Sequence, residues 1–65
     1  MIRVNGEERP LPEQPTVREL VRELGLGDSP CAVEVNGSLV PHRRHEHHTL
    51  QPGDAIEIVT LVGGG

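Results

Sequence analysis

Apolar and polar residues alternate along segments 1–5 and 31–35, which is the pattern of a strand with one buried face. Each segment ends at an Asn-Gly pair, Asn5-Gly6 and Asn36-Gly37. Such pairs favour a tight two-residue turn, because both residues tolerate positive φ. The pattern therefore predicts two β-hairpins. We expect their short returning strands at 8–11 and 38–40.

The clearest helix lies over 16–24. Thr16 and Glu19 have the spacing of a capping box, with Thr16 as the N-cap and Glu19 at the third helical position. Gly25 follows where a helix end favours a left-handed residue. The apolar residues recur at helical spacing and form one stripe. They are Val17, Leu20, Val21 and Leu24.

The last predicted strand, 55–62, is apolar on both faces. Ile56 and Ile58 share one face, while Val59 and Leu61 share the other. A strand of this kind is central in its sheet or offers one face to a partner. We expect Ile56 and Ile58 to pack against the helix stripe.

The element order is strand, strand, helix, strand, short strand, strand, and only one helix is available to cover a sheet. If the first and last strands pair, they are parallel neighbours in the middle of that sheet. The sequence therefore predicts an α+β protein of the β-grasp (ubiquitin-like) type. Its mixed sheet of four to five strands wraps on the helix 16–24. Residues 1–62 are expected to form the single domain, and 63–65 a flexible C-terminal glycine tail.

Composition restricts the possible functions. The chain has 65 residues, no aromatic residue and a formal net charge of -4. Without aromatic platforms or clustered cations, nucleic-acid binding is not expected. One cysteine cannot form an internal disulfide, and no apolar run approaches a membrane span. We therefore expect a cytoplasmic protein that binds neither nucleic acid nor a membrane.

The order of these motifs resembles the ThiS family of small sulfur carriers of thiamine biosynthesis, and more loosely their MoaD and ubiquitin-like relatives. Two departures from the family pattern concern the histidine-rich segment. The family commonly has Arg where this chain has His42, and it often has an aromatic residue near His45. The segments that carry the resemblance are 2–6, 16–20, 32–37, 39–41, 53–59 and Gly64-Gly65.

The resemblance implies a carrier that is a co-substrate rather than an enzyme. A ThiF-like adenylating enzyme would use ATP to activate the Gly65 carboxylate, while the carrier itself binds no cofactor. An unknown sulfur donor would then convert the adenylate into a thiocarboxylate, which a ThiG-like thiazole synthase consumes. Gly63 and Gly64 would thread into the partner enzyme, because residues without a Cβ pass most easily through a narrow channel.

Val59 and Leu61 are the candidate docking residues, because one helix covers only one face of the sheet. The alternative is that residues 38–50 cover them. The acidic balance of the chain would favour a basic docking face on the activating enzyme.

The histidine cluster and the single cysteine are weaker candidates. His42, His45, His47 and His48 include a helical i, i+3 pair that could bind zinc. No ligand constellation of recognisable spacing accompanies them, so we interpret them as part of a solvated loop and expect no metal. Cys31 is interpreted as a small, partly buried residue rather than a sulfur-handling thiol.

Three other functions stay open on the sequence alone. A MoaD-like carrier for molybdopterin or tRNA thiolation would have the same fold and tail. A ubiquitin-like protein modifier would form isopeptide bonds, and a passive binding module would not use the tail.

Overall fold

The computed structural model describes residues 1–61. The predicted glycine tail, and Val62 at the end of the predicted last strand, lie outside these described residues. The elements, in chain order, are β1 (Ile2–Val4), β2 (Glu7–Arg9), α1 (Val17–Glu23), β3 (Cys31–Val35), β4 (Ser38–Val40), the 3-10 helix η1 (His42–Arg44) and β5 (Ala55–Thr60).

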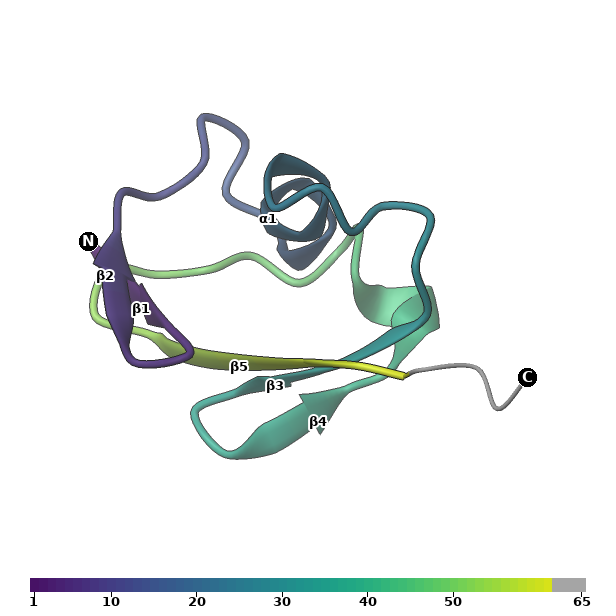
Figure 1. The fold of residues 1–65 in the computed structure, drawn as a ribbon. Helices are drawn as coiled ribbons and strands as arrows, with labels where there is room; N and C mark the ends of the chain where they lie inside the picture. Colours follow the sequence, from purple (N-terminus) through teal and green to yellow (C-terminus); the bar gives the residue numbers. More distant parts are fainter. Residues whose placement is uncertain (62–65) are drawn as a thin grey trace.

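The five strands form one mixed sheet in the order β2-β1-β5-β3-β4. β5 lies at its centre, parallel to β1 and antiparallel to β3. The two remaining pairs, β1 with β2 and β3 with β4, are antiparallel hairpins. Figure 1 shows α1 lying across one face of this sheet. This is the predicted β-grasp topology, with the first and last strands as parallel neighbours.

The two Asn-Gly pairs form the predicted turns. Asn5 and Gly6 have φ values of 49° and 86°, and Asn36 and Gly37 have 52° and 84°. Positive φ at both central residues matches the right-handed twist of the paired strands. The first hairpin is shorter than expected, because its returning strand β2 spans Glu7–Arg9 and ends before the first proline. Proline has no N–H to donate to the ladder.

Helix α1 begins where the sequence predicts, but half of the predicted capping box is absent. The Thr16 hydroxyl accepts a hydrogen bond from the Glu19 N–H at 3.2 Å. The Thr16 N–H donates to the Gln14 carbonyl at 2.8 Å, so it does not need the Glu19 carboxylate. Glu19 instead lies 3.5 Å from Arg22, one turn further along the helix. Its side chain therefore serves an ion pair rather than the cap.

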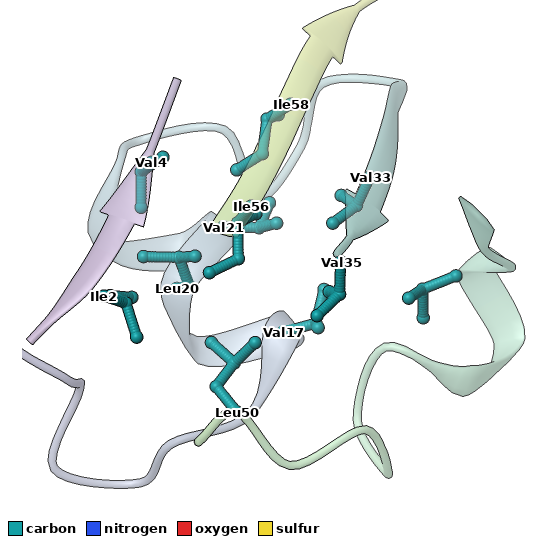
Figure 2. Packing of buried hydrophobic residues seen from close by; sticks show 11 residues of the cluster. Ile2, Val4, Val17, Leu20, Val21, Val33, Val35, Leu50, Ile56 and Ile58 are labelled. Atoms are coloured by element: carbon teal, nitrogen blue, oxygen red, sulfur yellow. The ribbon is translucent and has the colours of Figure 1, made fainter. Parts of the chain in front are cut away.

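The core lies between α1 and the sheet (Figure 2). Leu20 and Ile56 are each 1% exposed and belong to one buried cluster, as the two periodicities predict. Leu24 is only partly buried and packs at the edge of this cluster. Leu50, from the segment before β5, is 2% exposed and was not expected in the core. The cluster comprises Ile2, Val4, Val17, Leu20, Val21, Val33, Val35, Val40, Leu50, Ile56 and Ile58.

The opposite face of the sheet is here called the outer face. Figure 1 shows no helix or loop of the described chain lying over it. Its apolar side chains Leu39, Val59 and Leu61 are exposed. The sheet therefore has one buried face and one exposed face. The only α-helix of residues 1–61, α1, is far too short to cross a membrane.

Candidate functional site

The end of β5 is where the structure leads into the predicted glycine tail. Thr60 pairs with Cys31 in the β3–β5 ladder. The Leu61 N–H then donates to the Pro30 carbonyl at 2.9 Å, so the chain is held to its neighbour up to the last described residue. The predicted reactive group on Gly65, and the predicted threading residues Gly63 and Gly64, lie outside the described part of the chain.

Side-chain hydrogen bonds hold the middle of β5 in place. The ladder between β1 and β5 has two residue pairs. The Asn5 amide extends it: its nitrogen donates to the Ile58 carbonyl at 3.2 Å, and its oxygen accepts from the Ile58 N–H at 2.8 Å. Asn5 thus has two functions, because the same residue also forms the first hairpin turn. The strand that leads to the tail is therefore fixed from β1 as well as from β3.

A second asparagine fixes the start of β5. The Asn36 side-chain oxygen accepts from the Ala55 N–H at 3.0 Å, and its nitrogen donates to Asp54 Oδ1 at 3.0 Å. Asp54 Oδ2 in turn accepts from the Gln51 N–H at 2.8 Å, which closes the turn before the strand. Both Asn-Gly turns therefore contribute an amide that orients β5.

Val59 and Leu61 are exposed on the outer face, by 60% and 53%. The alternative that residues 38–50 cover them is wrong. That segment instead crosses to the helix side, where Leu50 joins the core. Sequence reasoning missed Leu39, which is 64% exposed on β4. Its position two residues after Gly37, on the face opposite the buried Val40, could have identified it.

The prediction of a solvated histidine loop is wrong for His45. This side chain is 6% exposed, and its Nε2 lies 3.1 Å from the Val40 carbonyl. Burial lowers the pKa of His45 below 6.5, and the nearby His42 and His48 lower it further, whereas the Val40 hydrogen bond opposes them. The signal that could have indicated this burial is the tendency of the family to carry an aromatic residue near this position.

The same segment, residues 42–48, accepts hydrogen bonds from the first N–H groups of α1. The carbonyls of His45 and His48 accept from the N–H groups of Arg18 and Val17, at 2.9 and 3.0 Å. The first N–H groups of a helix have no partner within the helix, so these bonds lower its free energy. Three or more His, Cys, Asp or Glu side chains in a metal-binding arrangement are not found among residues 1–61. These contacts give segment 42–48 a structural role.

Cys31 borders a groove of about 770 Å³ between α1 and η1. Arg18, Arg22 and Arg43 also line this groove, and Arg18 forms a 2.8 Å ion pair with Glu46. Cys31 is partly buried and packs against the core. It alternates with the buried Val33, so its side chain lies on the helix side of the sheet, away from the outer face.

Comparison with known proteins identifies the family. The ThiS family model matches residues 2–65. The chain belongs to the ThiS family. A solved structure of this family, the thiamine biosynthesis protein ThiS from Geobacter metallireducens, superposes with a TM-score of 0.78 at 28% identity. The match covers 98% of this chain and 97% of that protein, so the β-grasp fold is shared over essentially the whole length.

Two curated relatives have different lengths. The sulfur carrier protein ThiS from Thermus thermophilus is 39% identical over 70 residues, and the match covers 100% of both chains. A thiazole synthase from Paramagnetospirillum magneticum is 40% identical over 62 residues, which is 95% of this chain. This chain spans only 19% of the length of that thiazole synthase. A ThiS-like segment is thus part of a much longer polypeptide in that organism.

Proposed function

We propose that this ThiS-family protein carries sulfur for thiamine biosynthesis, as a thiocarboxylate on the Gly65 carboxyl group. The observation that carries the proposal is the full-length match to a sulfur carrier protein ThiS, over 100% of both chains. The geometry is consistent with that role. The central strand of the sheet is anchored on both sides, and two residues separate its end from Gly63-Gly64-Gly65 in the sequence.

The chemistry needs an activated carboxylate. A carboxylate oxygen of Gly65 attacks the α-phosphorus of ATP, and pyrophosphate leaves, so that an acyl adenylate forms. Sulfide (HS⁻) then attacks the carbonyl carbon, AMP leaves with the bonding electron pair, and the S–H proton is lost to solvent. The product is a thiocarboxylate, whose sulfur is a better nucleophile than the original oxygen. None of these steps requires a catalytic group on this chain, so we propose a co-substrate rather than an enzyme.

The described residues supply the surface on which a partner can dock, and the length of the tail limits how far the carboxylate can reach from it. Four residues separate Leu61 from the end of Gly65, and they span at most about 14 Å when extended. A partner enzyme must therefore bind the carrier body close to its own nucleotide site. We propose that Val59 and Leu61 supply that contact, because they are exposed immediately before the tail.

Two partners are proposed. The first is a ThiF-like adenylating enzyme, which would supply ATP and the activation chemistry. The second is a ThiG-like thiazole synthase, which would accept the sulfur. The second proposal is supported by the Paramagnetospirillum magneticum relative, because that protein is called a thiazole synthase and includes a ThiS-like segment.

The test combines ATP–pyrophosphate exchange with intact-mass analysis. The carrier is incubated with a ThiF-type enzyme, ATP and sulfide, and the expected product has one oxygen replaced by sulfur. A matched control, Cys31→Ser, is expected to give the same mass change, because the sulfur resides on the terminus. Large covalent adducts would support a protein modifier instead. A folded chain that supports neither exchange nor mass change would refute the proposal.

Sulfur transfer is then tested with two acceptor enzymes. The thiocarboxylate form is offered in parallel to a thiazole synthase and to a molybdopterin synthase. Loss of sulfur only to the thiazole synthase supports the thiamine branch. Loss only to the molybdopterin synthase would establish the MoaD-like alternative.

A further inference from the structure

Two glutamates face each other on the outer face of the sheet. Glu34 on β3 and Glu57 on β5 are directly opposite in the antiparallel ladder, and both are exposed. Further along the same ladder the Leu61 N–H donates to the Pro30 carbonyl. Hydrogen-bonded pairs recur at every second residue, so Glu34 and Glu57 also form such a pair, with Cα atoms about 5.5 Å apart.

This pair opposes the stability of the fold. Like charges directly opposite each other in an antiparallel sheet are destabilising. The ion pairs formed within residues 1–61 join Arg18 to Glu46, Arg22 to Glu19 and His47 to Glu46. Within that part of the chain, therefore, neither glutamate of the outer face has a cation within 4.0 Å. Arg3 on β1 is exposed on the same face, opposite Ala55, but it is not among the residues paired with either glutamate within residues 1–61.

Exposed apolar side chains lie beside the two carboxylates, on β4 and further along β5. Leu39 on β4 is directly opposite Glu34, on the side away from β5. Val59 is two residues beyond Glu57 on the same face of β5, and Leu61 follows. The outer face thus combines an unneutralised acidic pair with an apolar border that extends to the tail.

We propose that Glu34 and Glu57 together bind one cationic side chain, an arginine, on the adenylating enzyme. This inference rests on the function proposed above. A guanidinium presents several N–H donors in a plane and suits two adjacent carboxylates better than an ammonium group does. When Leu39, Val59 and Leu61 pack around it, they exclude water, and the lower local dielectric strengthens the ionic contacts. The unfavourable pair in the free carrier thereby becomes favourable in the complex.

A second copy of this chain is a poor occupant for the same face. A two-fold dimer buries the same patch on both subunits. It would bring four carboxylates together around Glu34 and Glu57, in a chain whose formal net charge is already -4. The acidic pair therefore disfavours self-association and favours a basic partner.

The test compares two double variants with the same net charge. Glu34→Gln with Glu57→Gln removes the acidic pair. Glu7→Gln with Glu23→Gln removes two exposed carboxylates that lie on β2 and α1. Calorimetry measures the affinity of each for a ThiF-type enzyme at low and high NaCl. We expect the first variant to bind at least about tenfold more weakly and with less salt dependence, and the control to stay within about twofold of the wild type.

Urea unfolding separates a binding role from a structural one. Removing the repulsion is expected to leave the unfolding midpoint of the Glu34, Glu57 variant unchanged or higher, while its binding weakens. Equal affinities of the two double variants would overturn the inference, as would a salt-resistant loss that accompanies a lower midpoint. If the enzyme adenylates the wild-type chain, such a failure leaves the proposed function intact. Absence of adenylation of the wild type overturns both.

Discussion

Leu20 tests the placement of α1 on the sheet most directly. Its side chain is 1% exposed and lies in the buried cluster between α1 and the central strand (Figure 2). Leu20→Ala removes apolar atoms and leaves a cavity, which costs about 2–5 kcal/mol at buried leucines. Leu39→Ala is the matched control, because the same chemical change occurs at a side chain that is 64% exposed. Exposed substitutions of this kind change stability by less than about 0.5 kcal/mol.

The size of the domain makes this loss severe. At about 0.05–0.15 kcal/mol per residue, a 65-residue chain has a free energy of unfolding of about 3–10 kcal/mol. Leu20→Ala therefore removes a large share of the total, and at the lower end of the range it unfolds the protein in water. Leu39→Ala is expected to stay folded, which also makes it suitable for binding experiments.

The assay is urea unfolding followed by far-ultraviolet circular dichroism, because the chain has no aromatic residue for fluorescence. With an m-value of about 1 kcal/mol per molar urea, the midpoint of Leu20→Ala falls by about 2–5 M. The midpoint of Leu39→Ala shifts by less than about 0.5 M. Equal shifts in the two variants, or an unchanged midpoint for Leu20→Ala, would show that α1 does not bury this residue.

Three further predictions concern docking, acidity and the tail. Val59→Asp is expected to weaken adenylation with little effect on the urea midpoint, because Val59 is 60% exposed, and loss of folding would contradict this. The pKa of His45 is lowered in the folded state, so below pH 6.5 the unfolded state binds more protons and the free energy of unfolding falls as the pH falls. Unfolding curves between about pH 7.5 and 5.5 are expected to show this slope in the wild type but not in His45→Phe; an equal slope in both would assign it to other groups. Deleting Gly65, or adding one alanine after it, misplaces the carboxylate by about 3.3–3.6 Å and is expected to reduce pyrophosphate exchange at least about 100-fold. Normal turnover by the extended chain would refute the proposed role of Gly65.

Local signals in the sequence were sufficient for most of the fold. The Asn-Gly pairs predicted both hairpin turns, because few residues adopt positive φ at low cost. Thr16 and the apolar stripe predicted the start and the buried face of α1. The alternation of Ile56 and Ile58 predicted the buried face of β5. In each case the determining interaction joins residues near in sequence, or depends only on the period of the element.

Other features depended on contacts between residues distant in sequence. Periodicity shows that one face of β5 is apolar, but only tertiary structure decides that residues 38–50 pass on the helix side and leave Val59 exposed. Burial of His45 depends on Val40 and on the start of α1, neither of which the polar local sequence indicates. The side-chain amide of Asn5 forms a hydrogen bond with Ile58 of β5, which is 53 residues away in the sequence.

The pairing of Glu34 with Glu57 across the sheet also depends on residues distant in sequence. Each glutamate is an ordinary exposed residue of its own strand, and nothing in the local sequence relates them. Only the register between β3 and β5 places them opposite each other, because a shift of one residue would move one set of side chains to the other face. The sequence by itself thus determined the elements and their buried faces. The tertiary structure decided which side chains meet across the sheet and which face stays open, because both follow from packing between distant segments.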